Sequence, residues 1–193
     1  MKKLTAPSFA NFSEYDLIRA LILIHKEALG RNLLMRELGL SEASTRSLMK
    51  KLSSSGFVKT TTKGIALTDS GKNFVHKVNT ILSGPAPINY GAFSISFKVS
   101  DSANMVNVGL EQRDAAVKAG AAGCLVFVYK NSRLVLPGVD GIEHVYLDIF
   151  NGVKENFSLS EGDVVIIAFA NTKRHAELGA WEAVKTLLIA KDI

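Results

Sequence analysis

The sequence contains a single cysteine, Cys124, among its 193 residues. One thiol excludes an internal disulfide bond and any zinc site built from several cysteines. Long apolar runs are also missing: the longest, Leu17 to Ile24, is interrupted by Arg19 and is far too short to span a bilayer. The basic start, Lys2-Lys3, is not followed by the apolar core of a signal peptide. These absences predict a cytoplasmic protein with no membrane partner.

The common motifs of enzymes are absent as well. The sequence has no dinucleotide-binding glycine motif, no P-loop, no serine-hydrolase elbow and no metalloprotease helix. The glycine-containing run from Ala119 to Gly123 joins a predicted helix to a predicted strand, whereas phosphate loops join a strand to a helix. Neither His144 with Asp148 nor His175 with Glu177 has a third metal ligand at a suitable spacing. The sequence therefore gives no basis for a catalytic residue, a cofactor or a metal.

Positive charge is concentrated in the first part of the chain. Residues 1–82 contain 13 Lys and Arg against 6 Asp and Glu, a net charge of +7, whereas residues 83–193 contain 10 against 12, a net charge of −2. Binding of a polyphosphate to a positive surface releases counterions and gains free energy. This distribution favours nucleic acid as the partner of the first part.

The stretch from Asn32 to Lys72 has the order helix, tight turn, helix, hairpin. The helical patterns cover residues 33–38 and 42–53, and the extended runs cover residues 57–62 and 65–68. Ser41 stands where its hydroxyl caps the second helix, and Gly56 follows that helix as a C-terminal glycine. Lys63-Gly64 forms the turn of the hairpin. This is the plan of a winged helix-turn-helix, a DNA-binding module.

Several short segments also resemble a known group of proteins. Leu40-Ser41, Leu48, Lys50-Lys51-Leu52 and Gly56-Phe57-Val58 resemble the recognition-helix signature of winged-helix transcription regulators of the MarR and related types. The segment Ala66 to Lys72 resembles the one that closes the wing in those families. The resemblance implies a DNA-binding regulator. The rest of the chain resembles, more faintly, the C-terminal region of uncharacterised archaeal winged-helix proteins, which brings no known activity with it.

The candidate DNA-binding side chains lie on the second helix of the pair and on the wing. Helical spacing directs Thr45, Leu48, Met49 and Leu52 to the core and predicts that the other positions face outward. An outward Arg46 fits a bidentate contact to guanine, and basic residues further along fit phosphates. The candidate set is Ser41, Ser44, Arg46, Ser47, Lys50, Lys51, Lys59, Thr61, Thr62 and Lys63. The alternative is an ordinary solvated surface.

Two further helices and a break complete the first part. Ser13 predicts the cap of a helix over residues 14–29, and Thr68 that of a helix over residues 69–82. The breaker-rich segment Ser83-Gly84-Pro85-Ala86-Pro87 then predicts a linker. The expected organisation is a winged-helix DNA-binding domain at residues 1–82, a linker at 83–87 and a second domain at 88–193.

The second domain reads as α+β. Strands are expected at residues 92–99, 123–129, 133–136 and 163–170, and helices at residues 111–119, 148–155 and 173–190. This order fits a mainly antiparallel sheet backed by helices, with a ferredoxin-like arrangement as one option. The last helix has an apolar stripe of Ala176, Ala180, Ala183, Leu187 and Leu188. The stripe either covers the sheet or joins two copies of the chain.

The leading prediction is a DNA-binding transcriptional regulator that acts as a homodimer on double-stranded DNA. Its second domain would mediate assembly or sense a small-molecule effector, whose identity the sequence does not give. One alternative is a winged-helix scaffold protein, because fold alone does not set function. The other is an enzyme with its activity in the second domain.

Overall fold

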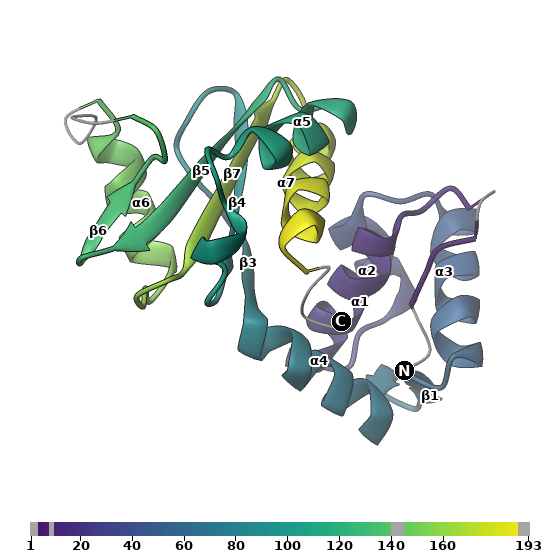
Figure 1. Cartoon of the computed structure of the whole chain (residues 1–193). Helices are drawn as coiled ribbons and strands as arrows, with labels where there is room; N and C mark the ends of the chain where they lie inside the picture. Colours follow the sequence, from purple (N-terminus) through teal and green to yellow (C-terminus); the bar gives the residue numbers. More distant parts are fainter. Residues whose placement is uncertain (1–3, 8–9, 140–144, 189–193) are drawn as a thin grey trace. The chain divides into compact units, whose positions relative to one another are not determined.

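The computed structural model describes residues 4–7, 10–139 and 145–188. The chain forms two compact units, residues 1–79 and 80–193, and Figure 1 shows both. The division falls inside the fourth helix, so the last residues of that helix belong to the second unit.

The first unit is a winged helix-turn-helix, as the sequence predicts. Its elements are α1 (Glu14–Lys26), α2 (Arg31–Leu38), α3 (Glu42–Ser54), β1 (Val58–Thr61), β2 (Gly64–Leu67) and α4 (Asp69–Ile81). Ser13 caps α1 in a capping box: its hydroxyl accepts from the Asp16 backbone N–H, and Asp16 Oδ2 accepts from the Ser13 backbone N–H at 2.7 Å. Leu17 and Leu21 of α1 are fully buried at the centre of the unit. The apolar residues of this helix therefore belong to the core of the unit.

The first helix ends three residues earlier than its apolar pattern predicts. Leu29 leaves the helix and pairs with Ile65 of the wing, with N···O distances of 3.1 and 2.9 Å in the two directions. The pairing keeps Leu29 buried, while Ala28 is exposed. Periodicity could not reveal this, because a residue that packs inward as a bridge has the same hydrophobic signature as one on a helix. The bridge fixes the wing to the start of α2.

The segment after the wing forms a tight structural junction. Thr68 Oγ1 accepts from the Gly71 backbone N–H at 3.1 Å, which caps α4, and donates to the Gly56 carbonyl at 2.6 Å. A Cβ on Gly71 would overlap the carbonyl oxygen of Phe57. The Ala66 to Lys72 segment thus holds the end of α3, the wing and α4 together.

The second unit is a five-stranded antiparallel sheet with helices on both faces. Its elements are β3 (Leu82–Pro87), β4 (Phe93–Val99), the 3₁₀ turn η1 (Ala103–Met105), α5 (Leu110–Lys118), β5 (Gly123–Lys130), β6 (Arg133–Val135), α6 (Leu147–Asn156), β7 (Val164–Ala170) and α7 (Lys173–Leu188). The strand order is β3-β4-β7-β5-β6, and Figure 1 shows α5 and α7 on one face and α6 on the other.

The segment predicted as a linker, residues 83–87, instead forms most of strand β3. It pairs with β4, with Leu82 opposite Val99 and Pro87 opposite Ile95. Proline cannot donate to a central strand, but it fits an edge strand whose outer side has no partner. β3 is an edge strand, so Pro85 and Pro87 are accommodated there.

The sheet only partly matches the ferredoxin-like option. β4 and β5 both pair antiparallel with β7, which makes β4-α5-β5 a split β-α-β unit around a central strand. In a ferredoxin-like sheet the inserted strand belongs to the β-hairpin. Here it is β7, and the hairpin strand β6 lies at the edge.

The last helix covers the sheet of its own unit. α7 packs against α5, β4 and β7, and Ala176, Ala180 and Ala183 are completely buried. Trp181 meets Phe97 of β4 edge to face, with ring centroids 6.3 Å apart. Of the two expectations for the α7 stripe, sheet covering is the one realised in the structure, because a sheet with an apolar face needs a helix layer of this kind.

Candidate DNA-binding surface

Helix α3 carries an exposed ridge of short and basic side chains. Its buried residues are Ser44, Thr45, Leu48 and Leu52, of which the last three fix the helix against the unit's core. Residues three and four positions apart share a helix face. The exposed ridge consists of Ala43, Arg46, Ser47, Lys50 and Ser53.

Arg46, the predicted base-reading residue, lies on this ridge with its guanidinium paired to Glu42. The Nη2 to Oε1 distance is 2.8 Å, and the two side chains are 67% and 64% exposed. An exposed pair of this kind contributes at most about 1 kcal/mol. The guanidinium can therefore exchange Glu42 for a base edge or a phosphate at small cost.

A hollow of about 470 Å³ lies between α3, the wing and the start of α2. Four basic residues border it: Arg31, Arg46, Lys50 and Lys59. They come from α2, α3 and β1, so the fold brings together charges that are distant in sequence. Sequence reasoning missed Arg31, although a basic residue at the first position of α2, directly after its Gly30 cap, was a usable signal.

A second hollow, of about 320 Å³, lies on the other side of the ridge. Its borders are Pro7, Ala10, Asn11 and Phe12 of the N-terminal arm and Ala43, Ser44, Ser47 and Lys51 of α3. The α3 ridge thus stands between the arm on one side and the wing on the other.

The expectation that Ser44 faces outward is wrong. Its side chain is only 7% exposed. Its backbone N–H donates to the Ser41 hydroxyl at 3.2 Å, and the two hydroxyl oxygens are 2.8 Å apart. Ser41 is the cap of α3, as predicted, and Ser44 completes that cap. Helical spacing places Ser44 one turn before the buried Leu48, so the arm side of the helix is covered at this position.

The predicted wing residues separate into two groups. Lys59, Thr62 and Lys63 are exposed. The Thr61 hydroxyl instead donates to the Gly64 carbonyl at 2.8 Å and accepts from the Lys63 backbone N–H at 3.3 Å. Thr61 therefore shapes the wing turn, which presents the lysine at its tip.

Comparison with known proteins adds to this geometry. Residues 90–187, slightly more than half of the chain, match the family model described as a domain of unknown function, DUF4443. The chain belongs to the DUF4443 family. In this DUF4443 protein, residues 14–82 also match the model of the CggR N-terminal DNA binding domain.

A solved structure is similar over nearly the whole DUF4443 chain. It is the hypothetical protein PH0730 from Pyrococcus horikoshii OT3, with 27% sequence identity and a TM-score of 0.80. The similarity covers 95% of this chain and 96% of that one. No curated protein matches the chain significantly. The N-terminal match indicates a DNA-binding regulator, while the comparisons assign no role to the DUF4443 domain.

Two features of the DUF4443 unit bear on possible chemistry, a buried thiol and a hollow. Burial raises the pKa of the Cys124 thiol to about 12, partly offset by a hydrogen bond with the Ile167 backbone. A hollow of about 570 Å³ lies between the η1 segment, the β5–β6 hairpin and the Glu161–Gly162 turn. Within the described ranges, no three His, Cys, Asp or Glu side chains gather as metal ligands, and no helix is long and apolar enough to cross a membrane. His144, considered with Asp148 as a metal pair, lies outside the described residues.

Proposed function

We propose that this DUF4443 protein is a transcriptional regulator that binds double-stranded DNA through α3 and the wing. The second unit holds two copies together or responds to an effector. The observation that carries the proposal is the convergence of Arg31, Arg46, Lys50 and Lys59 on one hollow beside the exposed ridge of α3. These residues belong to the part of the chain with a net charge of +7 over residues 1–82, from 13 Lys and Arg against 6 Asp and Glu.

The ridge and its flanks have different roles in the proposed complex. Short side chains on the ridge let α3 enter the major groove, where Arg46 reaches the O6 and N7 acceptors of guanine. The basic residues around the hollow then contact the phosphates that border the groove, which sets the orientation without reading sequence. Lys63 at the wing tip extends the same contact.

Selection of bound sequences from a random duplex pool tests the proposal. We expect a preferred site whose binding falls steeply with salt, because phosphate contacts release counterions. Failure to enrich any sequence, combined with weak and salt-insensitive binding, would contradict it and favour a scaffold role.

Substitution of Arg46 then tests its assigned role. Arg46→Ala should weaken binding to the selected site by about 1–3 kcal/mol and relax the preference at one base pair. The matched control is Arg133→Ala, which removes an exposed arginine from β6 in the second unit and should leave binding unchanged. Equal losses on selected and random DNA would make Arg46 a phosphate contact.

We propose the hollow of about 570 Å³ in the second unit as the site of effector binding. Its lining combines apolar Val106, Val128 and Val135 with charged Lys130 and Glu161, a composition typical of small-molecule sites. A screen of metabolites for an increase in melting temperature tests this role. Metabolites that still raise the melting temperature after substitution of Val128 would show that the effector binds elsewhere.

A further inference from the structure

The outer face of α5 is an exposed helix surface with no partner among the described residues of its own unit. The inner face packs on α7: Ala116 is fully buried, and Gln112 Nε2 donates to Thr186 Oγ1 at 2.8 Å. On the outer face, Leu110 is 53% exposed and Val117 is 44% exposed. Both apolar side chains are therefore available for contact with a partner.

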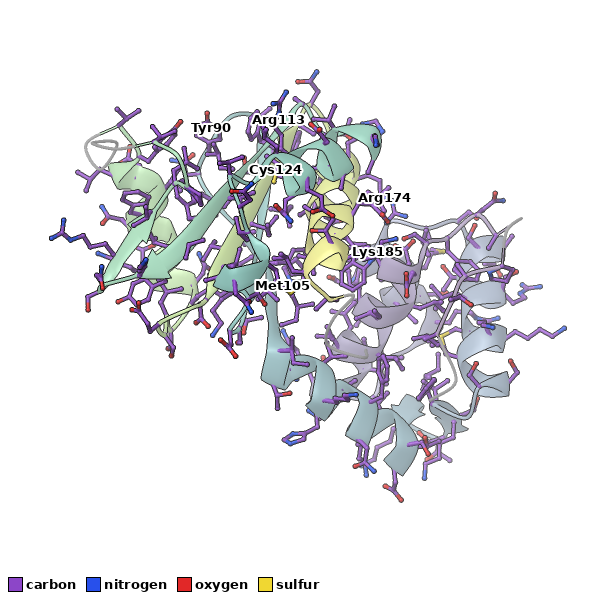
Figure 2. The ribbon with its side chains drawn as sticks, viewed as in Figure 1. Tyr90, Met105, Arg113, Cys124, Arg174 and Lys185 are labelled. Carbon is purple, nitrogen blue, oxygen red and sulfur yellow. The ribbon has the colours of Figure 1, made fainter. Side chains whose placement is uncertain are left out.

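The outer face also carries four charges in a regular arrangement. Leu110, Arg113, Asp114 and Val117 follow the spacing i, i+3, i+4, i+7 and form one stripe, apolar at both ends and charged in the middle. Glu111 and Lys118 lie together along one flank of the stripe. In the described part of the chain, none of these four charged side chains forms an ion pair. Figure 2 shows Arg113 at the edge of its unit.

We propose that this face of α5 joins two copies of the chain, packed antiparallel about a twofold axis between Arg113 and Asp114. The inference extends the proposed function and rests on it, because DNA binding supplies the reason for a dimer. In a twofold interface the same patch meets itself, so each contact occurs twice. Leu110 of one copy then faces Val117 of the second copy, and Arg113 faces Asp114.

The flank supports the same arrangement. With the helices antiparallel, Glu111 of one copy lies beside Lys118 of the second copy, less than one helical turn apart. All four charges of each α5 therefore gain a partner of opposite sign. A parallel arrangement brings Arg113 onto Arg113 and Asp114 onto Asp114, which like-charge repulsion disfavours. The charge order on α5 thus selects a second copy in one orientation.

Other surfaces of the second unit are less suited to self-association. The apolar stripe of α7 is buried against its own sheet. One sheet edge is β3, which contains Pro85 and Pro87, and the other is β6, which has only 3 residues. Short or proline-containing edges do not extend readily into a second sheet.

The proposed contact between the two α5 helices is small, so its affinity is low. A pair of helices of this length buries less than the roughly 800 Å² per partner of a standard interface. The free dimer is therefore weak. Two neighbouring half-sites on one duplex raise the effective concentration of the two copies and strengthen it.

Charge reversal on the full chain tests the proposal. Arg113→Asp brings two carboxylates face to face across the interface, and Asp114→Arg brings two guanidinium groups face to face. We expect each single reversal to raise the dimer dissociation constant at least about tenfold, as measured by sedimentation equilibrium without DNA. The double reversal R113D/D114R restores opposite charges and should return the constant to within about threefold of the original.

Apolar substitutions provide a matched comparison. Leu110→Gln should weaken the dimer, whereas Leu147→Gln, at a 57% exposed leucine of α6, should not. All of these side chains are exposed, so the fold is retained, which circular dichroism verifies. A chain that stays monomeric at every concentration overturns the inference, as does a dimer that ignores the single reversals or is not rescued by the double one.

The outcome is distinguishable from failure of the proposed function. Reversal variants that are monomeric should still bind a single half-site with the original affinity, because α5 lies outside the winged-helix unit. A dimer that responds to the reversals but binds no duplex would refute the DNA-binding role and leave the α5 interface standing.

Discussion

Gly71 is a residue at which the first unit tolerates no side chain. A Cβ there would overlap the carbonyl oxygen of Phe57, which accepts the backbone N–H of Thr68 at 3.0 Å. Backbone atoms cannot move aside as a flexible side chain can. The motif that resembles the closing segment of winged-helix regulators is therefore explained by packing.

Gly71→Ala should destabilise the winged-helix unit by about 1–3 kcal/mol, the usual cost of forcing an extra group into a packed site. Urea unfolding followed by circular dichroism measures the change. Ser70→Ala, at an exposed position of the same helix, is the control, and it should stay within about 0.5 kcal/mol. Equal stability of the two variants would show that the Phe57 carbonyl can shift.

Cys124 makes stability depend on alkaline pH. Its folded pKa is raised from 9.0 to about 12 because burial penalises the thiolate. Between these values the unfolded chain releases the thiol proton and the folded chain keeps it, so folding stability is lost as pH rises. We expect the urea midpoint to fall between about pH 9 and pH 11, and to fall less in Cys124→Ala.

The same burial predicts the reactivity of the thiol. The thiolate is the reactive form, so Cys124 should react slowly with Ellman's reagent in the native protein. The rate should rise to that of a free thiol in urea. Rapid native labelling would mean that β5 opens readily.

At the scale of elements, the wing holds the positive charges of Lys59 and Lys63 in place. The Leu29–Ile65 bridge holds its base, and the Thr61 hydroxyl orders its turn. The double substitution of Lys59 and Lys63 by Ala should lower affinity for every duplex and reduce the salt slope by up to about two units, about one for each phosphate that is no longer bound. Measurement of binding at several salt concentrations checks this.

The control for the wing removes two exposed lysines from the other unit. Lys130→Ala with Lys154→Ala makes the same change in net charge, and both residues are exposed in the second unit. The salt slope should not change. A slope equally reduced in the control would show that total charge, and not the wing, sets the dependence.

Sequence reasoning succeeded where local chemistry decides the structure. A hydroxyl at Ser41, a glycine at Gly56 and the Lys63-Gly64 turn each act within a few residues, so the helices and the hairpin of the first unit were predictable. It failed where the outcome depends on distant segments. The burial of Ser44 beside the arm and the departure of Leu29 from its helix are of this kind.

The same distinction between local and distant causes applies to the candidate DNA-binding surface. Arg46, Lys50 and Lys59 could be chosen from spacing and charge alone. Arg31 could be added only when the fold brought α2 to the same hollow. The strand at residues 83–87 was missed because proline is read as a breaker, and only the sheet order reveals that this strand lies at an edge.

At the scale of the whole molecule, the two units divide the charge and the surfaces between them. The first unit holds the excess positive charge and the basic hollow, and the second holds the sheet and the α5 face. This division predicts that the second unit folds by itself, provided that its edge strand is included.

We expect residues 80–193 to form a stable fragment and residues 88–193 to melt at least about 5 °C lower. The shorter fragment lacks β3, so it exposes the backbone edge of β4 and loses buried Leu82 and Ala86. Thermal unfolding of the two fragments, followed by circular dichroism, makes the comparison. Equal melting temperatures would show that β3 is dispensable and that the domain begins at residue 88.

The two edge strands of the sheet also bear on aggregation at high protein concentration. Open strand edges are templates for misassembly, since a neighbouring chain can add its own strand to the unpaired backbone. At one end the missing N–H groups of Pro85 and Pro87 leave gaps in any such template, and at the other the strand is too short to hold one. We therefore expect neither edge of this sheet to start fibrillar aggregation readily, and at β3 the reason lies in the same prolines that, in the sequence, predicted a linker.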